Sequence, residues 1–201
     1  PRDIFTTVPR SSILSTPYAS HATTPGAPGA LRGMRIGVIR ESMVYASEAF
    51  DALGDSYSIG VFSGETERNV TFFKIKDFGE GYDERVKQRI GSLAPMQQNR
   101  DGAGIRHAVQ SLASQPEHTK ILLYLMEGAP HDFKYEGKYA IDDTIRALAE
   151  AKQKGCQPLV LAYGASKDAF KDLPPFILYR AVTDPRDVPL LLPRWYAHLT
   201  I

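Results

Sequence analysis

The chain has 201 residues, of which 43% are apolar and 23% are charged. This composition is typical of a folded globular domain and excludes an intrinsically disordered chain or one built mainly of membrane spans. The 24 basic and 23 acidic residues give a formal net charge of +1, so no overall field attracts nucleic acid or an anionic membrane. We therefore expect a single domain over residues 1–201 that binds no nucleic acid.

Cysteine use and the chain ends predict a setting inside the cell. Cys156 is the only cysteine, which excludes an internal disulfide and a metal site built from several cysteines. No apolar run approaches the roughly 20 residues that span a bilayer, and the N-terminus does not resemble a signal peptide. We expect a cytoplasmic protein without a membrane span. Because the chain starts at Pro1, we also expect it to be part of a longer protein, and the family resemblance described below implies the C-terminal part.

The N-terminal part of the sequence predicts a strand, a long loop and a helix. Residues 3–8 are β-branched and aromatic, as in a short strand that ends before Pro9. Residues 17–33 are rich in proline and glycine, which predicts a long loop. From Ile36 to Leu53, apolar residues recur at spacings of three and four, which predicts an amphipathic helix that stops at the following glycine.

A hairpin and two helices are predicted next. Residues 57–63 and 69–78 are rich in valine, isoleucine and aromatic side chains and flank a polar turn, which predicts an antiparallel hairpin at a sheet edge. A charged stretch over residues 83–90 predicts a short helix. A further helix is expected to start near Asp101, with Ile105 and the apolar residues after it on the inner face.

Buried strands alternate with helices in the C-terminal half. Residues 120–126 form a nearly continuous apolar run, as in a central strand that is buried on both faces. The apolar pattern then predicts a helix over 141–151, strands at 159–163 and 175–182, and a last helix at 188–199. This alternation predicts an α/β fold with a mostly parallel sheet, one antiparallel edge strand and helices on both faces.

Few residues match a motif of known chemistry. The sequence contains no nucleophile elbow, no phosphate-binding loop and no His-Glu-x-x-His zinc motif. Glu127, His131 and Asp132 follow the predicted central strand, at the edge where open α/β sheets gather ligand groups. The simpler interpretation is a polar loop that caps the strand end. Gly102 and Gly104 lack the third glycine of a dinucleotide-binding loop, so they indicate only a tight start of a helix.

Several short segments, spread over the chain, form a recognisable set. They are Phe50-Asp51-Ala52-Leu53-Gly54-Asp55, Val61-Phe62-Ser63, Lys74-Ile75-Lys76-Asp77-Phe78, Asp101-Gly102-Ala103-Gly104-Ile105-Arg106-His107-Ala108, Gly128-Ala129-Pro130-His131-Asp132, Tyr135-Glu136-Gly137-Lys138-Tyr139, Asp142-Asp143-Thr144 and Leu192-Pro193-Arg194-Trp195-Tyr196. In order and spacing they resemble the von Willebrand factor A domain at the C-terminus of NorD and CbbO proteins, which are partners of MoxR-type AAA+ ATPases. The resemblance implies a Rossmann-like α/β fold.

The resemblance also implies where a metal site would lie. Domains of this fold usually hold Mg²⁺ through D-x-S-x-S after the first strand, a threonine, and an aspartate after the central strand. The first three positions fall on Ser11, Ile13 and Ser15, the threonine on Asn99 and the aspartate on Glu127, so only Ser15 matches. Mg²⁺ prefers charged oxygen ligands, and Glu127 is the one carboxylate in this set. We therefore expect no native cofactor, and at most weak Mg²⁺ binding through a degenerate site at Ser11, Ser15, Asn99 and Glu127.

For function, the resemblance implies a non-catalytic adaptor that works with a MoxR-type ATPase to activate or assemble a client, either a metalloenzyme or another multisubunit target. The partner-binding face would lie at the strand ends and include Ser12, Asp101, His131, Asp132, Tyr135 and Tyr139. Two alternatives stay open. Glu127 and His131 could form the acid–base pair of a hydrolase-like enzyme, although no nucleophile motif accompanies them. The other alternative is a purely structural role in an assembly.

Overall fold

The computed structural model describes most of the chain. The described residues are 10–17, 29–94, 96, 98–126, 128–163, 170 and 173–199. The elements are, in chain order, β1 (Arg10–Pro17), α1 (Gly29–Leu53), β2 (Ser56–Thr66), β3 (Asn69–Lys76), α2 (Glu84–Gly91), α3 (Asp101–Ala113), β4 (Thr119–Met126), α4 (Gly137–Gln153), β5 (Cys156–Tyr163), β6 (Leu178–Val182), the short 3-10 helix η2 (Pro185–Asp187) and α5 (Val188–Leu199). Within these ranges, no helix is both long and apolar enough to cross a bilayer.

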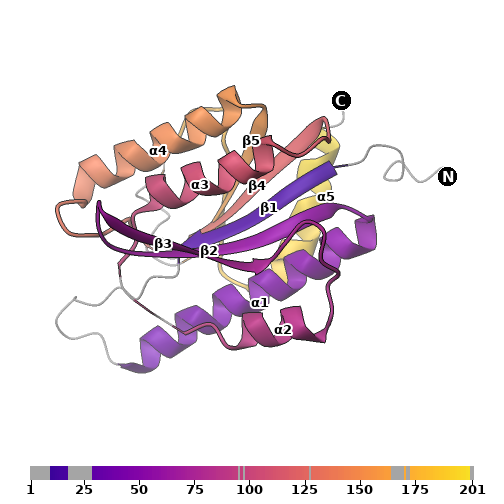
Figure 1. Ribbon diagram of the computed structural model, residues 1–201, viewed down its shortest axis with the longest axis horizontal. Coiled ribbons are helices and arrows are strands. Elements are labelled where there is room, and N and C mark those ends of the chain that lie inside the picture. The colour runs from indigo at the N-terminus through magenta and orange to yellow at the C-terminus, as the bar shows by residue number, and fades with distance from the viewer. Residues whose placement is uncertain are drawn as a thin grey trace.

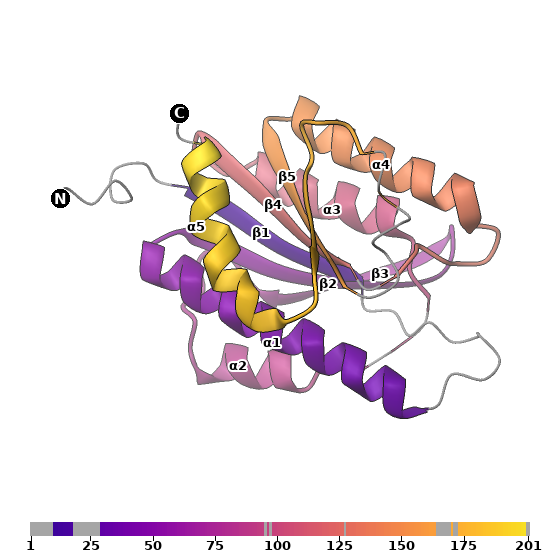
Figure 2. The same cartoon turned by 180° about the vertical axis from the view of Figure 1, so that it is seen from behind.

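Six strands of the described chain form one sheet, in the order β3-β2-β1-β4-β5-β6. Neighbouring strands are parallel except for β2 and β3, which are antiparallel and place β3 at an edge. Figure 1 shows α3 and α4 on one face of the sheet and α1 and α2 on the other. From behind, α5 lies beside α1 on that second face (Figure 2). The predicted α/β fold, with a mostly parallel sheet and one antiparallel edge strand, is confirmed.

Both faces of the central strands are buried, because helices cover each face. In β4, Ile121, Leu123 and Leu125 belong to the core on the side of α1 and α5. The alternate residues Leu122 and Tyr124 belong to the core on the side of α3 and α4. None of these five side chains reaches solvent. A strand covered in this way has no position for a solvated polar side chain, which explains the apolar run that predicts it.

Helix α1 begins earlier than the apolar pattern predicts. It covers Gly29–Leu53, so residues 29–33 of the predicted loop are helical, while Pro17 belongs to β1. No proline interrupts the sequence between residues 29 and 53, so the backbone can continue as a helix. The rest of the predicted loop lies outside the described residues. The helix stops where predicted, at Gly54, whose φ of +72° is a left-handed conformation that glycine adopts most easily.

The first described strand lies later in the chain than the predicted one. Residues 3–8, predicted as a strand, lie outside the described part. β1 spans Arg10–Pro17 and pairs with both β2 and β4, so it lies in the middle of the sheet. The segment Ser11–Thr16, expected to follow the first strand, is therefore itself a strand. Its hydroxyl side chains do not form the apolar pattern by which the other parallel strands were predicted.

The remaining elements lie close to their predicted positions. The hairpin, the short helix after it and the last helix are all present. The last strand is shorter than predicted because residues 174–177 form a turn, in which the amide of Ile177 donates to the carbonyl of Pro174 at 2.9 Å. β6 therefore starts only at Leu178.

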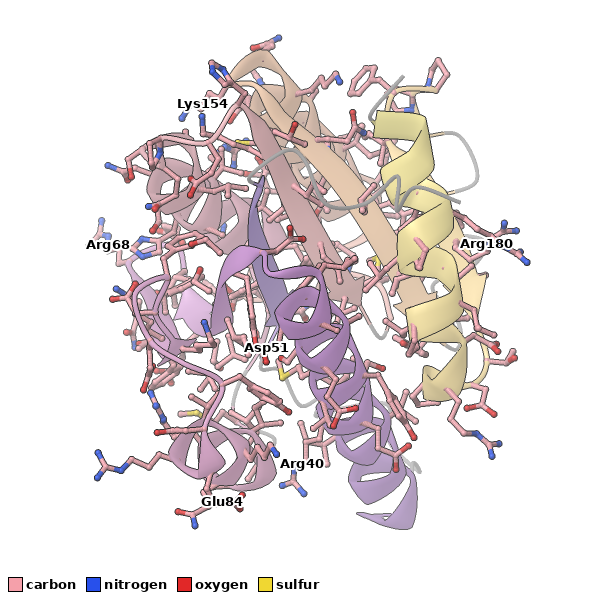
Figure 3. The ribbon with its side chains drawn as sticks, turned by 90° about the vertical axis from the view of Figure 1, so that its right-hand side faces the viewer. Arg40, Asp51, Arg68, Glu84, Lys154 and Arg180 are labelled. Atoms are coloured by element: carbon pink, nitrogen blue, oxygen red, sulfur yellow. The ribbon has the colours of Figure 1, made fainter. Side chains whose placement is uncertain are left out.

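Two arginine side chains lie on opposite sides of the sheet (Figure 3). Arg68 lies in the turn between β2 and β3, and Arg180 lies on β6. They point outward on opposite sides of the molecule. A charged side chain on an edge strand opposes pairing with another sheet, which is a role that Arg180 can fill on β6.

Lys76 at the end of β3 is buried, unlike the arginines at the edges. Its ammonium donates to the carbonyl of Tyr57 at 2.8 Å and lies 3.8 Å from the centroid of the Tyr57 ring. The residue is 2% exposed, and burial lowers the pKa of its amino group. A carbonyl and an aromatic face thus replace the water that a lysine normally keeps.

Helix α3 packs closely against the sheet at Gly104. A Cβ atom there would overlap the ring of Phe62 on β2. We predict that Gly104→Ala lowers the free energy of unfolding by about 1–3 kcal/mol, because the helix and the ring must move apart. Gly91→Ala is the control, because a Cβ atom at Gly91 has nothing within 4 Å. Urea unfolding followed by circular dichroism measures both variants, and equal stability would contradict the close packing.

Candidate functional site

The candidate site lies at the carboxyl edge of the parallel strands, where β4 ends and α3 begins. β1 enters the sheet from the side of the N label in Figure 1, so this edge lies toward the left of that view. Gly64 pairs with Gln98 there, and Asn99 pairs with His131. The amide of Asn99 donates to the carbonyl of His131 at 2.9 Å, and the amide of His131 donates back at 3.2 Å. These bridges join the segment before α3 to β2 and to the loop after β4.

A buried carboxyl group adjoins this bridge. Asp101 is fully buried at the start of α3, and the side-chain amide of Asn99 donates to its Oδ1 at 2.7 Å. Its Oδ2 and the hydroxyl of Tyr124 have no hydrogen bond of ordinary geometry within the described part of the chain. Burial raises the pKa of Asp101 to about 7, and the neighbouring Tyr124 and Asn99 side chains oppose that rise. The edge therefore contains a carboxyl group that titrates near neutral pH.

The loop after β4 contains a tight turn from Asp132 to Tyr135, which exchange backbone hydrogen bonds of 2.7 and 2.9 Å. Lys134 in this turn has a φ of +55° and is the only non-glycine residue of the described chain with a positive φ. An ion pair of 2.9 Å between Arg100 and Asp132 fixes the base of the turn, and their side chains are 11% and 0% exposed. Arg100 also donates to the carbonyl of Phe133 at 3.0 Å, which leaves the turn little freedom.

Tyr135 connects the turn to α3 and α4. Its hydroxyl accepts from the amide of Gly102 at 3.1 Å and donates to Asp143 at 2.8 Å. The guanidinium of Arg100 lies 4.5 Å from the centroid of the Tyr135 ring, and the ring of Tyr139 meets it edge-on at 5.4 Å. The hydroxyl and the ring of this buried tyrosine therefore both have specific partners.

Arg106 completes the polar contact between α3 and α4. It donates to Asp143 at 2.9 Å and to both carboxylate oxygens of Glu150 at 2.7 and 3.2 Å. Hydrogen bonding raises the pKa of the guanidinium, Glu150 contributing most, and in turn lowers the pKa of Glu150. Gly102 is required beside this cluster, because a Cβ atom there would overlap the carboxylate of Asp143. The tight helix start predicted at Gly102 thus has a specific steric cause.

The residues predicted to bind a partner divide into an exposed and a buried group. His131 has a side chain that is 40% exposed, and Tyr139 is 60% exposed. Asp101, Asp132 and Tyr135 are at most 1% exposed. The three buried residues are not accessible to a partner protein in this conformation. A partner at this edge would contact their exposed neighbours.

The structure places Ser11 and Ser12 away from this edge. In the parallel pairing of β1 with β4, Ser11 aligns with Lys120, near the amino end of β4. Ser12 follows directly, and only Ser15 approaches the carboxyl end. Because β1 continues to Pro17, its carboxyl end comes well after both serines, and a role for Ser11 and Ser12 stays a prediction.

The predicted metal site is described only in part. Glu127, the one carboxylate of the predicted set, lies outside the described residues. Asn99 lies at the edge, but its side chain already donates to Asp101 and accepts from the amide of His131 at 3.2 Å. In the described ranges, no group of three histidine, cysteine or carboxylate side chains is placed to share a metal ion. Metal binding at Ser15 and the other mapped positions stays a prediction.

Sequence reasoning missed the residues that organise this edge. Arg100, Arg106 and Asp143 make the hydrogen bonds that hold the turn and join the two helices. Arg106 and Asp143 do lie in segments that carry the family resemblance, which is the only signal that could have found them. No spacing rule connects two residues that are 37 positions apart.

The buried carboxyl group of Asp101 makes stability depend on pH. Its pKa is about 7 in the folded protein, against 3.8 for an ordinary aspartate. Between these values the folded state keeps a proton that the unfolded state has lost. The stabilisation from this proton is complete below pH 3.8 and is lost as the pH rises to about 7.

We predict that Asp101→Asn removes this loss of stability. Asparagine keeps an acceptor for Asn99 but cannot ionise, so the variant should gain on the order of 2 kcal/mol over the wild type at pH 8 and little near pH 4. Urea unfolding between pH 4 and 8 measures the difference, with Asp142→Asn at an exposed position as the control. A difference that does not change with pH would contradict the assignment.

Sequence comparison relates the chain to part of longer proteins. No protein-family model matches the chain. An uncharacterized protein of Pseudomonas aeruginosa is 39% identical over 137 residues, which are 68% of this chain and 22% of that protein. Protein NorD of Brucella suis is 35% identical over 166 residues, which are 81% of this chain and 26% of NorD. The chain thus spans about a quarter of the length of the curated relatives that it matches.

Solved structures of the same fold are von Willebrand factor A domains. The vWF domain of the type V pilus tip protein Mfa5 from Porphyromonas gingivalis has a TM-score of 0.61 at 8% identity, over 96% of this chain and 95% of that chain. The von Willebrand factor type A structure from Catenulispora acidiphila has a TM-score of 0.60 at 14% identity, over 94% of this chain and 42% of that chain. The manganese-loaded TRAP protein of Plasmodium vivax has a TM-score of 0.60 at 11% identity, over 92% and 72%.

Identities this low establish the fold alone, whereas the NorD match establishes a relationship in sequence. Both agree with the resemblance seen in the sequence and confirm its two main parts, the von Willebrand factor A fold and the relationship to NorD. The chain therefore has the fold of a von Willebrand factor A domain and is homologous to a segment of the NorD proteins.

Proposed function

We propose that the chain is a non-catalytic adaptor domain that works with a MoxR-type AAA+ ATPase to activate or assemble a metalloenzyme or another multisubunit target. Homology to NorD and the von Willebrand factor A fold support a role in protein interaction. Because the chain matches only part of NorD, the activity of the longer protein belongs to the proposal as well. The observation that carries the proposal is a rigid polar network under a set of exposed side chains at the strand ends.

These exposed residues are His131, Phe133, Lys134 and Tyr139, which we call the partner face. The buried hydrogen bonds beneath them restrict the loop before a partner arrives. A surface that is ordered in advance loses less conformational entropy on binding, so more of its contact energy appears as affinity. The arrangement therefore favours recognition of another protein.

The enzymatic alternative depends on Glu127 and His131. The imidazole of His131 lies 3.3 Å from the carboxylate of Glu136, whose side chain is 72% exposed. A general base usually lies in a desolvated cleft, whereas this imidazole faces a carboxylate that is itself largely exposed to solvent. This geometry favours binding over acid–base catalysis.

Metal binding at this edge is expected to be weak, because the mapped positions are poor in charged oxygens. We predict that millimolar Mg²⁺ or Mn²⁺ changes the free energy of unfolding by less than about 0.2 kcal/mol. Thermal unfolding of protein first treated with a chelator measures this change. A clear rise in stability with metal concentration would contradict the degenerate site.

Direct binding tests the proposed partner. We predict that the chain binds the purified MoxR-type ATPase of the same organism, and that combining His131→Ala with Tyr139→Ala weakens binding by about tenfold. Leu190→Ala is the control, because Leu190 is 64% exposed but lies on α5, on the other side of the sheet. Calorimetric titration with ADP or a non-hydrolysable ATP analogue measures the Kd. No binding by the wild type would overturn the ATPase partner, and unchanged binding by the double variant would overturn the partner face.

A further inference from the structure

We propose that Phe133 and Lys134 are the specificity-determining anchor of the partner face, and that they recognise a protein pocket with an apolar interior and carboxylates at its rim. The inference rests on the proposed function and adds the chemistry of the surface that the partner presents. These two residues combine exposure, a fixed backbone, a left-handed conformation and a charge that has no carboxylate partner among the described residues.

Exposure alone does not distinguish Phe133, which is 56% exposed. Large apolar side chains that are exposed singly are common on protein surfaces. In the described chain they also include Met96, Tyr139, Phe176 and Leu190. What sets Phe133 apart is the way in which its backbone is held.

Both backbone polar groups of Phe133 are bonded to a buried ion pair. Its amide donates to Oδ1 of Asp132 at 2.7 Å, and its carbonyl accepts from Arg100 at 3.0 Å. Arg100 and Asp132 bond to each other at 2.9 Å. The backbone that presents the ring is therefore ordered in the free protein, and a partner does not have to order it. An aromatic ring held in this way suits the centre of an interface.

The conformation of Lys134 also points to a use of its side chain. Its φ of +55° is left-handed, which costs a lysine roughly 1–2 kcal/mol and costs glycine almost nothing. The fold alone would therefore favour glycine at this position. Backbone strain of this kind concentrates at binding sites, where the side chain or the shape of the turn is needed.

Lys134 supplies a positive charge that its neighbours do not neutralise. Arg100, Arg106 and Lys138 each pair with a carboxylate. Lys134 has no such partner within the described residues, and its ammonium lies 5.2 Å from the centroid of the Phe133 ring. A partner that covers the ring would also remove water from this ammonium, and a desolvated cation needs a carboxylate. The complementary surface is therefore an apolar pocket with an acidic rim.

An aromatic ring beside a lysine is also the chemistry by which some proteins hold single-stranded nucleic acid. Such binding needs a basic groove along which several phosphates can lie. Here the neighbouring arginines and Lys138 are paired, and the chain has a net charge of only +1. The observations favour a protein partner, and nucleic acid is an outcome of the test.

The test compares single substitutions in the calorimetric titration with the MoxR-type ATPase. Phe133→Ala should weaken binding by about 30-fold, because it removes the ring that fills the pocket. Lys134→Glu should weaken binding by about tenfold and reduce its dependence on salt, because it places two negative charges together. Lys134→Gly keeps the left-handed turn and removes the side chain without adding a negative charge, so it should weaken binding less than Lys134→Glu.

Phe176→Ala and Lys87→Glu are the matched controls and should leave the Kd unchanged. Phe176 is 37% exposed, and Lys87 lies on α2 across the sheet. If Phe133→Ala binds as tightly as Phe176→Ala, the anchor is overturned while the proposed function stands. If the wild type does not bind the ATPase, the proposed function fails and the anchor fails with it. Binding of a labelled single-stranded oligonucleotide that Lys134→Glu abolishes would overturn the protein pocket.

Discussion

The hydroxyl of Tyr135 is the contact on which the arrangement of the site depends. It accepts from the amide of Gly102 at the start of α3 and donates to Asp143 in α4, while its ring belongs to the turn that carries Phe133. A buried hydroxyl left without partners costs roughly 1–3 kcal/mol, so these two bonds stabilise the arrangement of the site. Because the bonds reach separate segments, they hold the loop and both helices in one relative position. The conformation of the exposed partner face therefore depends on the buried hydroxyl of Tyr135.

The parts of the fold that could be predicted from the sequence are those that leave a local apolar pattern. β4 is buried on both faces and α1 on one, so continuous runs and helical spacings predicted both. β1 lies equally deep in the sheet, but its segment Ser11–Thr16 is rich in hydroxyl side chains. Its place is set by pairing with β2 and β4, which lie far away in the sequence and leave no local signal. The position of Ser11 and Ser12 away from the carboxyl edge follows from that one strand.

The position of the loop after β4 at the carboxyl edge of the sheet could be predicted, whereas the contacts within the candidate site could not. Ligand groups gather at the carboxyl ends of parallel strands, so the loop after β4 was the expected place. Burial separates Asp101, Asp132 and Tyr135 from the exposed residues, and burial depends on how the loop lies against α3. The ion pair of Arg106 with Asp143 likewise exists only because α3 packs against α4. The type of a polar residue therefore does not show whether its side chain is exposed to a partner or buried beneath the loop.

The ion pairs at the carboxyl edge of the sheet are relevant to whether this edge suits catalysis or protein recognition. Arg100, Arg106 and Lys138 each pair with a carboxylate, and the pairs of Arg100 and Arg106 join segments that are far apart in the sequence. Asp101, whose pKa lies near neutrality, is buried under the surface that a substrate would reach. A catalytic acid or base needs both a suitable pKa and access to the reacting atoms, and these two properties are separated here. The edge combines buried polar contacts with exposed aromatic rings, which is a combination suited to the recognition of another protein.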